Sequence, residues 1–175
     1  PKKRLSLFGL GNRKEGTLDV ETGDVAVGTL LPFGEVARVC DAKGAKVLGE
    51  RIARTASRGY SLYDSNPSYV GARTFYVTGF KDKCPRQFTA ALALFGAPEI
   101  HEQLRYGKPS KLYPYSTTDK AYEKVKSAVC KVGKSKPCGA NMAKLERDTV
   151  FISTYEKFTD NARWADILLH EGVVA

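Results

Sequence analysis

The residues of this sequence best suited to covalent chemistry are its four cysteines and two histidines. Cys84 directly precedes Pro85 at the expected start of a helix, and a helix dipole lowers the pKa of a thiol at its N-terminus. His101 and His170 are the side chains that could accept the proton of that thiol. One hypothesis is therefore a small hydrolase in which Cys84 is the nucleophile and a histidine is the base.

The same cysteines could instead form two disulfides, because an even number of cysteines is typical of proteins from oxidising compartments. The favoured pairing joins Cys130 to Cys138 across a short loop, which leaves Cys40 to pair with Cys84. This interpretation places the protein in the periplasm or the secreted space and removes the free thiol of Cys84. The alternative is four unrelated thiols in a cytosolic protein.

Motifs of the common enzyme classes are missing from the sequence. The serine hydrolase pattern G-x-S-x-G does not occur, and His101-Glu102 is not continued to H-E-x-x-H because Arg105 stands in the last position. The segment Gly133 to Ser135 ends like a P-loop, but the glycine required five residues earlier is Ala128. No two cysteines have the close spacing of zinc ligands. We therefore expect no metal and no cofactor, and a binding or structural protein more than an enzyme.

Positive charge is concentrated in two segments of this basic chain, whose formal net charge is +9. Residues 1–16 carry a net +4, residues 105–136 a net +7, and the remainder a net −2. A lysine is a point charge without the planar fork of arginine, so such a surface would bind polyanions without specificity. The residues expected to form this anion-binding surface are Arg105, Lys108, Lys111, Lys120, Lys124, Lys131, Lys134 and Lys136.

Its partner would be an anionic polymer of the cell envelope or a protein. Tyrosines interleave with these basic residues, and basic surfaces with aromatic residues can bind single-stranded nucleic acid. Nucleic acid is therefore a third possible partner, less favoured than the other two. The alternative for the whole segment is a solvated lysine-rich face, stabilised where its cations lie near the C-terminus of a helix.

A tyrosine-rich stretch is the remaining candidate for ligand binding. Tyrosine gives a large contact area at a low cost in side-chain entropy and is enriched in binding surfaces. The alternative is a strand edge followed by a turn at Pro67. The residues expected in this ligand loop are Arg58, Tyr60, Tyr63, Asp64 and Tyr69.

The strands and helices that position these residues are predicted from the spacing of apolar residues and from the prolines and glycines at the ends of each segment. Short strands are expected within 17–40 and at 74–78, where β-branched and aromatic residues dominate. Helices are expected over 86–95, from Pro98 to Gly107, and over 118–131, the last one with Ser116 and Asp119 as a capping pair. The strands resume at 149–155 and, with imperfect alternation, within 162–174.

This order predicts an α+β fold in which N-terminal and C-terminal strands form an antiparallel sheet covered by about three central helices. We expect residues 1–16 to be a basic flexible arm, which could tether the chain to a membrane, and residues 17–175 to be one domain. No apolar run is long enough for a transmembrane helix. The leading hypothesis is an extracytoplasmic, non-enzymatic binding or structural domain that contacts an anionic polymer or a protein. The Cys84 hydrolase and a nucleic-acid-binding module are the alternatives.

Overall fold

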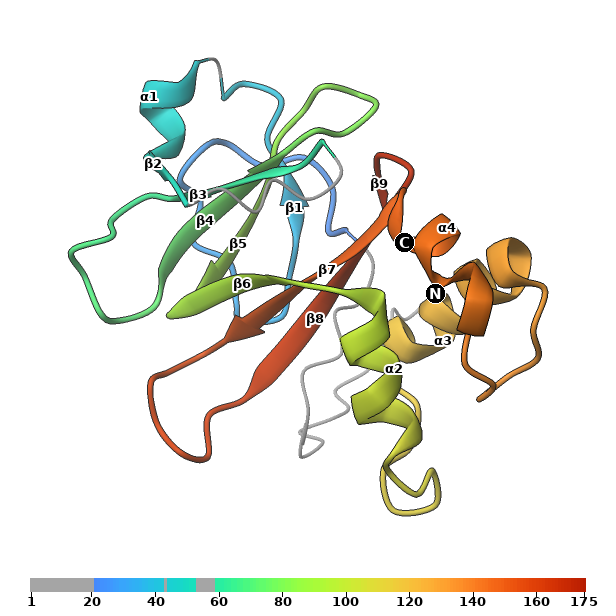
Figure 1. Cartoon of the computed structure of the whole chain (residues 1–175). Helices are drawn as coiled ribbons and strands as arrows, with labels where there is room; N and C mark the ends of the chain where they lie inside the picture. The colour runs from blue at the N-terminus through green and yellow to red at the C-terminus, as the bar shows by residue number, and fades with distance from the viewer. Residues whose placement is uncertain (1–20, 43, 53–58) are drawn as a thin grey trace, which may run out of the picture.

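The computed structural model describes residues 21–42, 44–52 and 59–175. The expected arm at 1–16 and Arg58 lie outside the described residues. Two antiparallel sheets and a group of helices make up an α+β fold (Figure 1). Within the described residues, no helix combines the length and the apolar character that a bilayer span requires.

The first sheet contains five strands in the order β1-β5-β4-β3-β2, and a short helix, α1 (Ala45–Leu48), precedes β2. Its strands are β1 (Ala37–Arg38), β2 (Glu50–Arg51), β3 (Ser61–Asp64), β4 (Arg73–Thr78) and β5 (Arg86–Ala90). Phe75 and Phe88 are directly opposite on β4 and β5, and their rings stack with centroids 5.7 Å apart. This cross-strand aromatic pair fixes the register of the two central strands.

The second sheet contains four strands in the order β6-β7-β8-β9. Its strands are β6 (Leu92–Gly96), β7 (Thr149–Tyr155), β8 (Trp164–His170) and β9 (Val173–Val174). All neighbouring strands are antiparallel, and β7 pairs with β8 along its whole length. Because β6 follows β5 directly, the chain passes from the first sheet to the second at Ala91.

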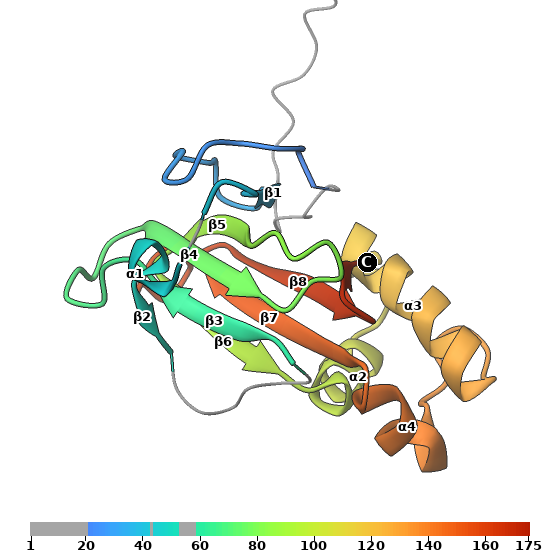
Figure 2. The ribbon, with the colours of Figure 1, turned by 90° about the horizontal axis from the view of Figure 1, so that it is seen from above.

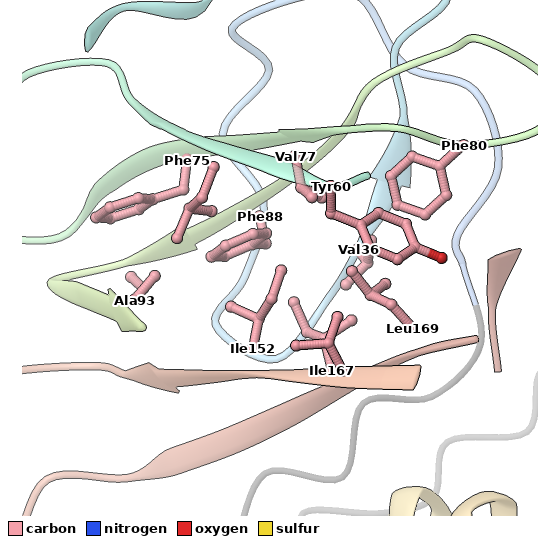
Figure 3. Close-up of a cluster of buried hydrophobic side chains, with 13 residues drawn as sticks. Val36, Tyr60, Phe75, Val77, Phe80, Phe88, Ala93, Ile152, Ile167 and Leu169 are labelled. Atoms are coloured by element: carbon pink, nitrogen blue, oxygen red, sulfur yellow. The ribbon is translucent and has the colours of Figure 1, made fainter. Parts of the chain in front are cut away.

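The two sheets pack face to face over an apolar core. Figure 3 shows Ile152 of the second sheet pointing toward Phe88 of the first, and Leu169 of the second sheet pointing toward Tyr60. Each of these side chains is almost fully buried. Burial of this apolar area is the main favourable contribution to holding the sheets together.

The other face of the second sheet is covered by helices α2 (Pro98–Tyr106), α3 (Thr117–Cys130) and α4 (Met142–Glu146), with a 3₁₀ turn at Gly139–Asn141. Successive strand residues point to opposite faces, so Phe151 and Leu168 face away from the inter-sheet core. They pack against Tyr122 of α3 and Leu145 of α4 in a second apolar cluster. Figures 1 and 2 both show α2, α3 and α4 gathered together beside this sheet. The layers are therefore sheet, sheet and helices.

Several predicted elements are confirmed. Helix α2 begins at Pro98 and ends just before Gly107, and α3 begins after Ser116 with both bonds of the capping box in place. Strand β7 spans the predicted 149–155, and β8 and β9 account for 162–174.

The helix expected over 86–95 is wrong, because this segment forms β5 and β6. A short apolar run fits a buried strand as well as a buried helix, and here the pairing with neighbouring strands decides the outcome. The single expected sheet is likewise two sheets, since the chain crosses between them inside that same run. Of the strands expected within 17–40, the described part holds β1 and an isolated bridge between Asp24 and Arg38.

Candidate functional site

A pocket of about 320 Å³ lies where α2 and the start of α3 meet the face of β6, β7 and β8. Its volume falls within the range of small-molecule sites, which begins at about 300 Å³. The polar lining residues are His101, Arg105, Lys108, Ser116, Thr118, Asp119, Ser153 and Asp166. The remaining lining residues are Gly96, Ala97, Ile100, Leu104, Tyr113, Phe151, Tyr155 and Trp164.

His101 stands between the two acidic side chains of this pocket. Its Nε2 atom lies 3.4 Å from Asp119 Oδ1, and its Nδ1 atom lies 4.0 Å from Asp166 Oδ2. The ring stacks on Phe151 with centroids 4.3 Å apart and meets the edge of Tyr122, so the side chain is only 10% exposed. This burial lowers the pKa of His101 to about 4. The imidazole is therefore neutral at pH 7.

Each carboxylate has one oxygen bonded within the fold. Asp119 is the third residue of α3, where its Oδ2 accepts the Ser116 N–H while its own N–H is donated to Ser116 Oγ. Asp166 on β8 accepts a 2.7 Å hydrogen bond from the hydroxyl of Ser153 on β7. Burial raises the pKa of Asp166 to about 6. The second oxygen of each carboxylate, Asp119 Oδ1 or Asp166 Oδ2, is the one nearest His101.

Arg105 and Lys108 supply the positive charge of the lining. Arg105 donates from Nη2 to the Tyr113 carbonyl, lies 3.8 Å from Asp119, and covers the ring of Tyr115 at 4.4 Å. Lys108 follows α2 and is exposed, with Nζ 5.4 Å from the ring centroid of Tyr113. With one arginine, one lysine, two aspartates and a neutral histidine, the lining carries no net charge at pH 7.

Partly exposed apolar side chains form the rest of the pocket lining. Ile100 and Leu104 are four residues apart on α2 and therefore share a face of that helix. Leu104 is 62% exposed and Trp164, at the start of β8, is 39% exposed. Large apolar groups left open beside convergent polar groups are typical of a site for an organic ligand.

Two buried polar atoms of the lining have no hydrogen-bond partner, namely His101 Nε2 and Arg105 Nε. Most buried polar atoms in native proteins are hydrogen-bonded, so two unpaired atoms in one pocket call for an explanation. A bound ligand would explain them if a small movement of these two side chains let it hydrogen-bond to both atoms.

A nucleophile aligned with His101 is not found among the described residues of this pocket. The hydroxyl of Ser153 is donated to Asp166, and the Ser116 oxygen accepts from the backbone of Asp119. Neither serine hydrogen-bonds to the imidazole. The pocket therefore has groups that can bind and exchange protons, without a prepared covalent catalyst.

The disulfides join Cys40 to Cys84 and Cys130 to Cys138, the pairing favoured from the sequence. The sulfur of Cys84 consequently offers no free thiol, which corrects its candidacy as a nucleophile. The other candidate base, His170, lies on β8 with Nδ1 2.8 Å from the hydroxyl of Thr149. It does not line the pocket of His101.

The predicted anion-binding residues fall into two groups. Arg105 and Lys108 line the pocket, whereas the others are exposed on α3 and on the loops that flank it. These exposed lysines are Lys111, Lys120, Lys124, Lys131, Lys134 and Lys136, and we call them the lysine surface. Within the described residues, none of them forms an ion pair with an acidic side chain.

The structure buries two residues of the predicted ligand loop, Tyr60 and Asp64, and leaves Tyr63 and Tyr69 at least partly exposed. Tyr60 is buried in the inter-sheet core and accepts a hydrogen bond from Gly172. Asp64 is buried on β3 and forms a two-point ion pair with Arg73. Tyr63 is half-buried on the same strand, and Tyr69 is exposed.

Sequence reasoning placed His101, Arg105 and Lys108 among the candidates but did not bring them together. It used Asp119 only as a helix cap and omitted Asp166. An aspartate inside an otherwise apolar strand is itself unusual, and this signal could have identified Asp166. No group of three or more His, Cys, Asp or Glu in the described part of the chain is arranged to hold a metal ion.

Comparison with models of protein families, with curated proteins and with solved structures gives no match to this chain. Its function therefore has to be inferred from the chemistry of the pocket and the surface.

Proposed function

We propose that this chain is an extracytoplasmic binding domain that takes a small amphipathic molecule into the pocket beside His101. The observation that carries the proposal is the meeting of unpaired buried polar atoms with an exposed apolar wall in one pocket. The two disulfides are consistent with an oxidising compartment, either the periplasm or the secreted space.

Binding is favoured over covalent catalysis for a physical reason. Nucleophilic catalysis needs a base within hydrogen-bond reach of a hydroxyl or thiol. In this pocket the serines are bonded elsewhere, and burial makes His101 a weak base by lowering its pKa to about 4. Such a group can orient a ligand as a neutral donor and acceptor.

A fragment screen by NMR with ¹⁵N-labelled protein tests the proposal. We expect bound fragments to shift the amide signals of residues on α2 and β8, and Leu104→Trp to prevent this by filling the pocket. Leu112→Trp is the matched control, because Leu112 is also an exposed leucine but does not line the pocket. The proposal fails if no fragment shifts these signals, or if Leu104→Trp binds the same fragments as well as the unmodified protein.

A second function is supported by the lysine surface, which could hold an anionic envelope polymer or an acidic protein. Its exposed side chains carry positive charge that no acidic partner in the described residues offsets. Lysine-rich surfaces attract polyanions through long-range electrostatics, and salt screens this attraction over about 8–10 Å. A nucleic acid would be attracted by the same charge and is the less favoured partner.

Heparin chromatography in a salt gradient tests this second function. We expect Lys120→Glu with Lys124→Glu to elute at clearly lower salt than the unmodified protein. The control is Lys144→Glu with Lys157→Glu, which changes the net charge equally at exposed positions outside the lysine surface. Equal losses in both double variants would show that total charge, not this surface, governs retention. Comparison with an oligonucleotide column separates polyanions in general from nucleic acid.

A further inference from the structure

The pocket contains both acceptors and donors that form no hydrogen bond within the fold. The acceptors are Asp119 Oδ1 and Asp166 Oδ2, each a carboxylate oxygen beside His101. The donors are Arg105 Nε, which has no partner, and Lys108 Nζ, which is exposed and forms no ion pair within the described residues. A neutral His101 adds one donor and one acceptor. A ligand that satisfies both sides must itself carry donors and acceptors.

The two signs of charge also lie close to one another. Lys108 and Asp166 line the same pocket, and the positive charge of Lys108 partly opposes the rise in the pKa of Asp166 that burial causes. Arg105 lies 3.8 Å from Asp119 on the other side of the imidazole. The 3.8 Å separation of Arg105 and Asp119 suits a ligand whose own opposite charges are near neighbours, as the ammonium and carboxylate of an α-amino acid are.

The exposed apolar wall specifies the rest of the ligand. Leu104 and Ile100 from α2 and Trp164 from β8 line the same pocket as the charged groups. Trp164 has Lys108 Nζ 5.7 Å from its ring centroid, so the apolar wall and the positive group are adjacent. An apolar or aromatic side chain on the ligand would cover these residues and gain the free energy of their burial.

We propose that the ligand is a free α-amino acid with a large apolar side chain, whose ammonium group is held by Asp119 and Asp166 and whose carboxylate is held by Lys108 and Arg105. This inference rests on the proposed function and names the ligand class of the same pocket. A zwitterion suits a lining with separated charges and no net charge. Because Arg105 and Asp119 already lie 3.8 Å apart, a purely anionic ligand would leave Asp166 without a charged partner, and a purely cationic ligand would leave Lys108 without one.

Isothermal titration with four related probes tests the inference. The probes are L-phenylalanine, phenethylamine without the carboxylate, 3-phenylpropionate without the ammonium, and N-acetylphenylalaninamide without either charge. We expect phenylalanine to bind best and each probe lacking one charge to bind about tenfold more weakly or worse, as expected for the loss of hydrogen bonds to charged groups. The neutral probe should bind weakest.

Variants show which side chain binds the ammonium group of the ligand and which binds its carboxylate. Asp166→Asn should weaken the preference for phenylalanine over 3-phenylpropionate, and Lys108→Ala should weaken the preference over phenethylamine. Asp160→Asn and Lys157→Ala are exposed, lie outside the pocket, and should change neither preference.

The outcomes separate this inference from the function on which it rests. If a singly charged probe binds as well as phenylalanine, or if fragments bind while all four probes do not, the zwitterion is wrong and the pocket is still a binding site. If neither fragments nor probes bind, both fail. Because the probe series is measured on the unmodified protein, the test does not depend on the variants folding.

Discussion

Asp166 and His101 share one wall of the pocket, and burial moves their pKa values in opposite directions. The pKa of Asp166 rises from an ordinary 3.8 to about 6, while that of His101 falls from 6.5 to about 4. Burial disfavours the charged form of each group, which is the anion for aspartate and the cation for histidine. As pH rises from about 4 to 6, Asp166 therefore reduces the free energy of unfolding, whereas His101 increases it.

Replacing Asp166 with asparagine isolates the first of these effects. The folded protein holds the Asp166 proton more tightly than the unfolded chain, so the stability due to this group is present at low pH and is lost as pH rises toward 6. We expect Asp166→Asn to match the unmodified protein near pH 3 and to exceed its free energy of unfolding at pH 7, by on the order of 3 kcal/mol. Asparagine can still accept the Ser153 hydroxyl. Urea unfolding at a series of pH values measures the difference, and a difference that is independent of pH would contradict it.

Lys126 shows why individual residues of the site could not all be predicted from the sequence. It contributes to the positive charge of 105–136, yet the structure buries it completely. Its Nζ lies 2.6 Å from Glu123 and donates to the Lys136 carbonyl, so it ties the loop after α3 to the helix. Composition reports the number of charges but not which of them are neutralised inside the fold. The meeting of His101 with Asp166 is equally invisible, because 65 residues separate them in the chain.

At the scale of elements, helix α3 begins at a cap that also faces the pocket. Ser116 Oγ accepts the Asp119 N–H, and Asp119 accepts the Ser116 N–H in return. These bonds satisfy two N–H groups that the helix itself leaves without partners. They also fix one oxygen of Asp119, so that its other oxygen lies toward His101.

Removing the cap should therefore affect both stability and the pocket. We expect Ser116→Ala to lower the free energy of unfolding by about 1 kcal/mol, the usual cost of losing a serine cap. Ser127→Ala is the control, since Ser127 is exposed within the same helix and alanine is favourable there. Urea unfolding of both variants gives the comparison. Equal stability of Ser116→Ala and the unmodified protein would show that the capping box does not stabilise the helix.

Elements were predictable where local chemistry determines them. The boundaries of α2 and α3 follow from Pro98, Gly107 and the Ser116–Asp119 pair, all within one turn of the helix ends. The segment 86–96 has similar local signals in Pro85 and Gly96, but they do not decide its structure. Its apolar residues fit either a helix or a strand, and the long-range pairing of Phe88 with Phe75 selects the strand. The division into two sheets follows from the same non-local choice.

At the scale of the whole molecule, each disulfide belongs to a different layer. Cys40–Cys84 links the chain just after β1 to the chain just before β5, so it lies beside the first sheet. Cys130–Cys138 links the end of α3 to the residue before the 3₁₀ turn and is part of the apolar cluster under the helices. The two bonds enclose very different lengths of chain, with separations of 44 and 8 residues.

The two disulfides should stabilise the protein unequally. Because a cross-link removes more conformational entropy from the unfolded chain when it closes a longer loop, we expect Cys40→Ala with Cys84→Ala to cost about 4 kcal/mol and Cys130→Ala with Cys138→Ala about 2.5 kcal/mol. Urea unfolding measures both losses. An equal or reversed order would mean that packing of the buried Cys130 and Cys138 outweighs loop entropy.

The oxidation state itself is the control for that comparison, and it also bears on the compartment. Intact mass after alkylation of the unfolded chain should show no modification without reductant and four added groups with it. Modification of all four cysteines without reductant would contradict the disulfides and the extracytoplasmic proposal that depends on them. The protein would then belong to a reducing compartment, where nucleic acid becomes the polyanion to test first against the lysine surface.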